Sequence, residues 1–157
     1  MIVWLASFPR SGNTFLRILL NRLYGVRSSV VYDVDGVAAR LGQEFVGFEN
    51  RPASYDEMRS SSAIHFVKTH RQRDSDVDAG DRAICLMRDG RDCLVSWARM
   101  QSETDPDLYE TKLREMIDRT DPIGTGSWGA NVLSWLMPEM PNRVVVHYGE
   151  LVAIPKP

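Results

Sequence analysis

Three features are scarce or missing in this chain of 157 residues, and each absence narrows the class of protein. The two cysteines, Cys85 and Cys93, are too few for a disulfide framework and have no metal-binding spacing. The first apolar run, residues 2–8, is far shorter than the roughly 20 residues that cross a bilayer, and no basic leader precedes it. We therefore expect a cytoplasmic protein in a reducing compartment, with no metal site and no stable membrane insertion.

Charge of one sign is not in excess either. Nineteen Lys and Arg against 21 Asp and Glu give a formal net charge of -2, so no global positive field favours nucleic acid as a partner. Any anion site must be built locally. The 43% hydrophobic and 25% charged residues are ordinary for a soluble globular protein, and we expect residues 1–157 to form a single domain.

Short apolar runs alternate along the chain with segments of helical periodicity. Strands are expected at four runs that each end in turn or polar residues: 2–7, 63–67, 82–87 and 143–147. Helices are expected from Thr14 to a stop at Gly25, from a cap at Asp92, over 109–119 and over 128–137. The alternation predicts an α/β fold, a three-layer parallel sheet with flanking helices.

Three sequence details follow from this prediction. In the first helix Phe15, Ile18, Leu19 and Leu23 recur at the spacing of a buried face, which leaves Arg17 elsewhere. Residues 71–82 are polar and are expected to form a solvated loop. Trp128 and Trp135 on the last helix are expected to pack in the core, with a substrate wall as the alternative.

Polar side chains follow three of the expected strands. In parallel sheets ligands bind at the carboxyl ends of the strands, and Arg10, Lys68, His70 and Arg88 stand at those ends. Several polar groups that converge on one edge of a buried sheet are what an anionic ligand requires.

The segment S-F-P-R-S-G-N-T, residues 7–14, joins the first strand to the first helix. The first turn of a helix has unpaired N–H groups that attract phosphate or sulfate. Gly12 permits close approach of the backbone, Arg10 supplies charge, and the hydroxyls of Ser11 and Thr14 can add hydrogen bonds. The segment is not a Walker A loop, because the first glycine is missing and an asparagine replaces the lysine. It indicates a phosphate cradle, with an ordinary turn as the alternative.

Three segments together resemble one known family. W-L-A-S-F-P-R-S-G-N-T (4–14) is similar to the phosphosulfate loop of sulfotransferases that use 3′-phosphoadenosine 5′-phosphosulfate (PAPS). F-V-K-T-H (66–70) is similar to the segment with their catalytic base, and L-M-R-D-G-R-D-C-L-V-S (86–96) to their 3′-phosphate motif. The resemblance runs from residue 4 to 151 and implies a P-loop nucleotide-hydrolase-like sulfotransferase fold.

The resemblance also implies roles for individual residues. The general base falls on His70, and an imidazole that titrates near neutrality can take the proton of an acceptor. Lys68 and Arg10 fall beside the reacting group, where they can stabilise the charge on the leaving phosphate. Tyr148 is placed near the adenine, although glycine follows it where the family often has an acidic residue. The PAPS-binding set implied is Arg10, Ser11, Gly12, Asn13, Thr14, Arg88, Ser96 and Tyr148.

The implied reaction transfers a sulfonate from PAPS to a hydroxyl or amine of a small-molecule, carbohydrate or lipid acceptor. Family members continue beyond the position of Pro157, so we expect a fold truncated at the C-terminus and association into a homo-oligomer as one way to cover the surface left there. The main alternative is a fragment that binds PAPS or its product 3′-phosphoadenosine 5′-phosphate (PAP) without turnover. A P-loop kinase and a cysteine phosphatase are two others; the C-x-x-x-x-x-R spacing starts at Cys85, inside an apolar strand where a thiolate is disfavoured.

Overall fold

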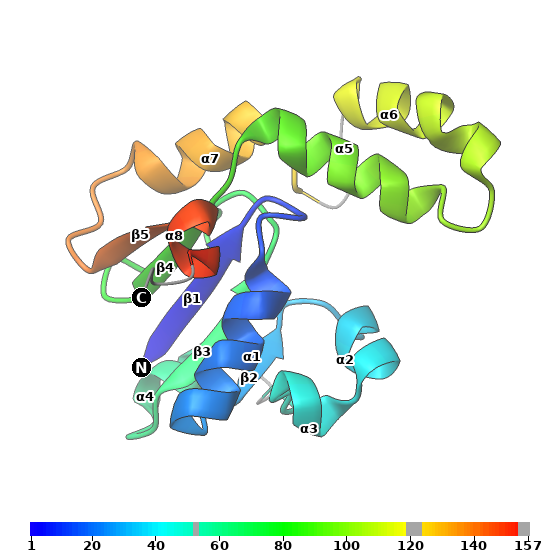
Figure 1. Cartoon of the computed structure of the whole chain (residues 1–157). Coiled ribbons are helices and arrows are strands. Elements are labelled where there is room, and N and C mark those ends of the chain that lie inside the picture. Colours follow the sequence, from blue (N-terminus) through cyan, green and yellow to red (C-terminus); the bar gives the residue numbers. More distant parts are fainter. Residues whose placement is uncertain (52–53, 119–123, 154–157) are drawn as a thin grey trace.

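The computed structural model describes residues 1–51, 54–118 and 124–153, and its centre is one parallel β-sheet. Within these residues the sheet has five strands in the order β2-β3-β1-β4-β5 (Figure 1). The strands are β1 (Ile2–Ser7), β2 (Ser28–Val30), β3 (His65–Thr69), β4 (Arg82–Met87) and β5 (Arg143–His147). The predicted α/β class with a parallel sheet is confirmed.

Strand β1 lies at the centre of the sheet, and all six of its residues are buried. It pairs with β3 from Ile2 opposite His65 and with β4 from Val3 opposite Arg82. A parallel strand covered on both faces needs a continuous apolar run rather than an alternating one, and β1 has that run.

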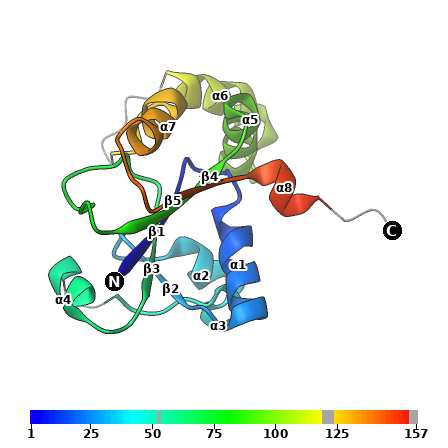
Figure 2. The same cartoon turned by 90° about the vertical axis from the view of Figure 1, so that its left-hand side faces the viewer.

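Helices cover both faces of the sheet and its carboxyl edge (Figure 2). The helices on one face are α1 (Asn13–Tyr24) and α8 (Tyr148–Val152), and those on the other are α4 (Tyr55–Ser60) and α7 (Trp128–Leu136). The pair that extends over the carboxyl edge is α5 (Gly90–Gln101) and α6 (Tyr109–Ile117), joined by a 3₁₀ turn at Pro106–Leu108. The short helices α2 (Gly36–Leu41) and α3 (Gln43–Val46) stand beside α1 (Figure 1).

Two hydrophobic cores lie on opposite faces of the sheet, one on each side of β1. Trp4 packs with Met58 of α4 and Trp135 of α7, and Leu5 packs with Leu16 of α1 on the opposite face. Alternate side chains of a strand point to opposite faces, so one apolar strand serves both cores. Trp135 is 2% exposed, which confirms its predicted place in the core.

Helix α1 turns a different face inward from the one its apolar spacing predicts. Phe15 is 39% and Leu23 67% exposed, whereas Leu16 and Arg17 are buried. Arg17 occupies an inward position because a buried carboxylate and a buried hydroxyl receive it, as described below. A pattern of apolar residues cannot detect a buried ion pair, and this part of the prediction was wrong.

Several boundaries also differ from the prediction. Strand β3 continues through Lys68 and Thr69, which pair with Leu5 and Ala6, so the predicted range 63–67 was two residues too early. Asp89, and not Asp92, caps α5, because its carboxylate accepts the backbone N–H of residue 91. Helix α6 ends at residue 117 and α7 at 136, each slightly earlier than predicted, and position 119 lies outside the described residues.

Of the segment predicted as a solvated loop, residues 71–82, residues 71–81 form a loop with a buried anchor and Arg82 begins β4. Asp81 is 2% exposed, accepts the Trp4 Nε1–H at 2.9 Å and pairs with Arg59 at 2.8 Å. Burial alone would raise the pKa of Asp81, but these donors outweigh burial and lower it. No helix in the described part of the chain is both long and apolar enough to cross a bilayer.

Candidate functional site

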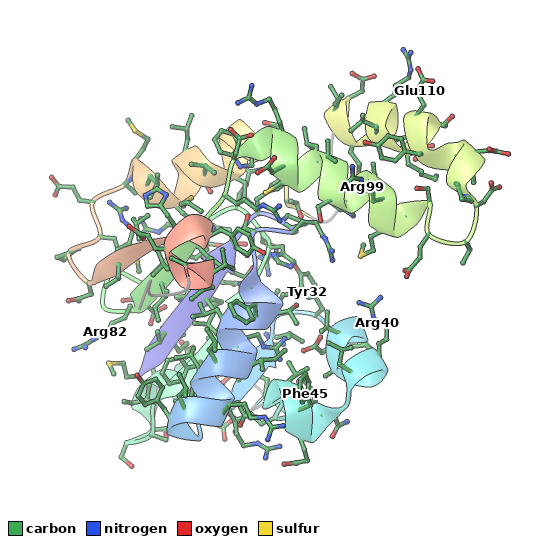
Figure 3. All side chains as sticks on the ribbon, in the orientation of Figure 1. Tyr32, Arg40, Phe45, Arg82, Arg99 and Glu110 are labelled. Carbon is green, nitrogen blue, oxygen red and sulfur yellow. The ribbon has the colours of Figure 1, made fainter. Side chains whose placement is uncertain are left out.

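A cleft of about 720 Å³ opens beside the N-terminus of α1 and the carboxyl ends of β1, β3 and β4. This volume is typical of small-molecule sites. Residues of α5 contribute to its lining, and Tyr32 and Arg40 line it from the segment that contains α2 (Figure 3). The cleft brings together nine of the residues predicted from the sequence: Arg10, Gly12, Asn13, Thr14, Lys68, His70, Arg88, Ser96 and Tyr148.

The loop between β1 and α1 presents the open start of a helix to this cleft. Gly12 stands at the N-cap with φ 99° and no side chain caps the helix, so the N–H groups of its first turn remain available to an anion. Arg10 has φ 68°, in the left-handed region that non-glycine residues seldom adopt. Strained backbone of this kind clusters at functional sites.

Tyr148 closes over this loop from the far end of the chain. A Cβ atom on Gly12 would lie 2.5 Å from the Tyr148 ring, so only glycine fits beneath it. The Arg88 guanidinium stacks 4.5 Å from the centroid of the same ring, and its Nη1 donates to the Arg10 carbonyl at 3.1 Å. Gly12 is therefore required by the packing of Tyr148 as well as by the turn.

Ser96 and Arg10 meet across the cleft. The Arg10 Nε–H donates to Ser96 Oγ at 3.1 Å, and its Nη1 lies 3.3 Å from the Met100 sulfur. Ser96 therefore lies on the side of α5 that faces the loop. Whether Ser96 contacts a ligand stays a prediction.

Two loop residues use their side chains to hold the loop rather than to face an anion. Ser11 is 1% exposed, and its hydroxyl lies 3.4 Å from Cys93 Sγ, so the hydroxyl does not serve the cleft as expected. The Asn13 amide donates to the Leu5 carbonyl at 2.9 Å and to Ser7 Oγ at 3.0 Å. The Ser11 N–H donates to the Phe8 carbonyl at 3.3 Å, so the backbone N–H of Asn13 is what these two residues can offer to a ligand.

His70 is set up as a neutral proton acceptor. Its Nδ1 lies 2.8 Å from the Ser7 carbonyl oxygen. A carbonyl can only accept, so Nδ1 carries the hydrogen and Nε2 keeps its lone pair. Burial lowers the pKa of His70 well below its ordinary value, and the nearby charge of Lys68 lowers it further.

Lys68 is the buried cation of the cleft. Burial lowers its pKa to about 8, while the carboxylate of Asp35 acts in the opposite direction. Its Nζ lies 5.0 Å from the centroid of the Tyr32 ring, a favourable position for an ammonium group. An anion in the cleft would stabilise the charged form of this lysine.

The sequence analysis missed the ion pair that supports the α2 side of the cleft. Arg17 Nη1 lies 2.7 Å from Asp35 Oδ2, and both side chains are almost completely buried. The Arg17 Nε–H also donates to Ser28 Oγ at 2.8 Å. Asp35 caps α2 by accepting the N–H groups of Val37 and Ala38. An Asp directly before G-V-A-A-R-L is an N-cap signal that could have revealed this helix.

The charges around the cleft are mostly positive, although the chain as a whole is slightly acidic. Among the described residues that line it, four are cationic and one is a carboxylate: Arg10, Arg40, Lys68 and Arg88 against Asp35. That carboxylate is already paired with a buried arginine. The cleft therefore suits an anionic ligand.

The structure gives little support to cysteine chemistry. Cys85 is fully buried, and burial raises the pKa of its thiol to about 11, which argues against the cysteine phosphatase alternative. Among residues 1–51, 54–118 and 124–153, no three His, Cys, Asp or Glu side chains are grouped as metal ligands would be.

The parallel sheet, the open helix N-terminus and the cationic cleft at the carboxyl edge define an α/β protein whose cleft is suited to an anion. The family model for the sulfotransferase domain matches residues 2–156, and the chain belongs to this family. The described structure, a five-stranded parallel sheet between helices, is consistent with the P-loop-like fold of sulfotransferases.

Three curated relatives are similar to the chain. WSCD family member GA21586 of Drosophila pseudoobscura pseudoobscura is 29% identical over 157 residues, 97% of this chain and 46% of the relative. WSCD family members CG9164 of Drosophila melanogaster and AAEL009094 of Aedes aegypti are each 29% identical over 153 residues, 94% of this chain and 44% of the relative. The chain thus spans about half the length of the curated relatives it matches.

Proposed function

We propose that this chain transfers a sulfonate group from PAPS to a hydroxyl or amine, with His70 as the general base. The observation that carries the proposal is that a neutral imidazole lines the same cleft as the open N-terminus of α1 and three cations of the sequence motifs. Membership of the sulfotransferase domain family supports the reaction class.

The cleft residues fit the anionic groups of PAPS. The first-turn N–H groups of α1 with Arg10 and Lys68 would hold the phosphosulfate, because both charges and donors are present there. Arg88 and Ser96 would hold the 3′-phosphate, and the Tyr148 ring would lie against the adenine. When bound, PAPS supplies the sulfonate that is transferred and the 3′-phosphoadenosine 5′-phosphate (PAP) that leaves.

The chain's own contribution is proton transfer and charge stabilisation. His70 Nε2 accepts the proton of the attacking hydroxyl or amine, while Nδ1–H remains bonded to the Ser7 carbonyl. Arg10, Lys68 and the α1 N–H groups stabilise the negative charge that builds up on the leaving phosphate. The acceptor class, the homo-oligomer and the cytoplasmic location stay predictions.

Calorimetric titration of the folded chain with PAP, with ATP-Mg as the control nucleotide, tests the site. Selective binding of PAP is expected. A folded chain that does not bind PAP would contradict the proposed function.

Transfer from ³⁵S-labelled PAPS to an acceptor panel then tests the role of His70. His70→Ala should retain PAP affinity and lose transfer, whereas the control His65→Ala, at the opposite end of β3, should keep transfer. If the panel yields no transfer but PAP binds, the chain is a PAPS- or PAP-binding module, the alternative to an active enzyme. A His70→Ala variant with normal transfer would contradict the role of the base.

A further inference from the structure

Both polar main-chain groups of His70 are bonded by side chains from distant parts of the chain. Its backbone N–H donates to Tyr32 Oη at 3.0 Å, and its carbonyl accepts from Asn131 Nδ2 at 2.9 Å. His70 directly follows β3, where the sheet no longer supplies partners for these groups. The two side chains therefore supply the main-chain hydrogen bonds that neighbouring strands supply inside the sheet.

Tyr32 contacts both residues that the proposed function places at the reaction. Its hydroxyl accepts the N–H of His70, and its ring lies under the ammonium group of Lys68. It also lines the cleft, which neither its place after β2 nor its neighbours in the sequence indicated.

Asn131 belongs to a row of side chains on α7 that bind the segment after β3. Asn131 is 1% exposed and also donates to the Thr125 carbonyl at 3.1 Å. One turn along the helix, Ser134 Oγ accepts the N–H of Arg73 at 3.0 Å, and Trp135 Nε1 donates to the Arg71 carbonyl at 2.9 Å. Residues three and four apart share one helix face, so α7 holds residues 70, 71 and 73 together.

We propose that Tyr32 and Asn131 are positioning residues for His70. The imidazole keeps its hydrogen on Nδ1 only while its ring stays against the Ser7 carbonyl of β1. The main chain that carries the ring is held on its N–H side by Tyr32 and on its carbonyl side by Asn131. Loss of either bond lets the ring leave Ser7 and mixes the two tautomers. The importance of this positioning for catalysis rests on the proposed function, whereas the hydrogen bonds that hold His70 are independent of it.

Nuclear magnetic resonance of the chain with ¹⁵N-labelled histidine tests the proposal without an acceptor. The chain has three histidines, and His65→Gln and His147→Gln assign the signals of His70. The wild-type imidazole is expected to show one tautomer with protonated Nδ1. Tyr32→Phe, which keeps the ring beside Lys68, should speed exchange of the His70 amide hydrogen roughly five- to tenfold, as loss of one hydrogen bond implies. Tyr32→Phe and Asn131→Ala should each populate the second tautomer.

Ser134→Ala is the matched control, because this serine lies on the same face of α7 but bonds the Arg73 N–H and the main-chain carbonyl of Asn131 instead of His70. It should leave the His70 signals as in the wild type. The proposal is overturned if Tyr32→Phe and Asn131→Ala also leave them unchanged, or if Ser134→Ala changes them equally. Titration of the wild type and of each variant with PAP tests the proposed function separately from the positioning of His70. A wild-type chain that does not bind PAP would count against the proposed function and would leave the result on positioning intact.

Discussion

Two sets of arginines in this chain occupy contrasting environments, one buried in the protein and one in the cleft. Arg17 is sealed inside the protein against Asp35, and no part of its charge faces solvent. Arg10 and Arg88 line the cleft, where Arg10 bonds a hydroxyl, Arg88 bonds a carbonyl, and the nearest carboxylate to Arg88 is 3.9 Å away. The buried arginine serves the architecture of the α2 side, whereas the cleft arginines keep charge available for a ligand.

This contrast shows why the type of residue alone did not identify its role. An arginine with a buried carboxylate partner is tested by measuring stability, and an arginine without one by measuring ligand affinity. The following predictions run from the largest expected effect to the smallest.

The largest effect is expected on stability, from Arg17→Ala. The change leaves the Asp35 carboxylate buried without its cation, which costs about 3–5 kcal/mol of unfolding free energy. Urea unfolding measures it, with Arg22→Ala, an exposed arginine of the same helix, as the control. Equal losses of unfolding free energy in the two variants would contradict a specific contribution of the buried ion pair to stability.

The same pair predicts a dependence on pH. Burial would raise the pKa of Asp35, but the charge and hydrogen bonding of Arg17 outweigh burial and lower it in the folded chain. Its contribution to stability is therefore present above the unfolded pKa of about 3.9 and is lost as the pH falls through the folded value. Asp35→Asn should flatten the loss of stability on acidification, as followed by thermal unfolding between pH 6 and pH 3.

The second-largest effect is expected on ligand affinity, from Arg88→Ala. Loss of a charge-assisted bond to phosphate should weaken PAP binding by roughly 1.5–3 kcal/mol, or about ten- to a hundredfold or more. Arg91→Ala is the control, because Arg91 is exposed and pairs with Asp89 outside the cleft. Unchanged affinity in Arg88→Ala, measured by calorimetry, would remove Arg88 from the phosphate site.

A smaller effect is expected from the titration of Lys68. With a pKa of about 8, Lys68 is charged below that pH and loses its charge above it, so PAP binding above pH 8 requires uptake of a proton. Affinity should fall about tenfold between pH 7 and pH 9. Lys68→Arg, which stays charged throughout this range, should give a flat profile; a flat profile in the wild type would contradict the assignment.

The smallest effect is expected at Glu110, on the exposed surface of α6 (Figure 3). Its carboxylate pairs with Arg114 at 2.8 Å, with three quarters of each side chain in solvent. Glu110→Ala should cost about 0.2–0.5 kcal/mol, less at high salt. A loss close to that of Arg17→Ala would erase the contrast between buried and exposed pairs.

Several elements of the fold were predictable from local pattern. The bounds of β1, β4 and β5 agree with the prediction, because each is an apolar or β-branched run that ends at a turn or a polar residue. Strand β2, with two serines in three residues, carries no such signal, and its place comes from pairing with β3. Helices α2, α3 and α4 are four to six residues long, too short for periodicity to reveal them.

The sequence by itself determined the parallel α/β fold, the open helix start after β1 and the set of cations and histidine at the strand ends, because these depend on short-range spacing. Only the tertiary structure decided which side chains surround them. Tyr32 and Asn131 reach His70 across 38 and 61 residues of chain. Tyr148 packs on Gly12 from the other end of the chain. Such contacts depend on how strands are ordered and helices packed, which no local pattern encodes.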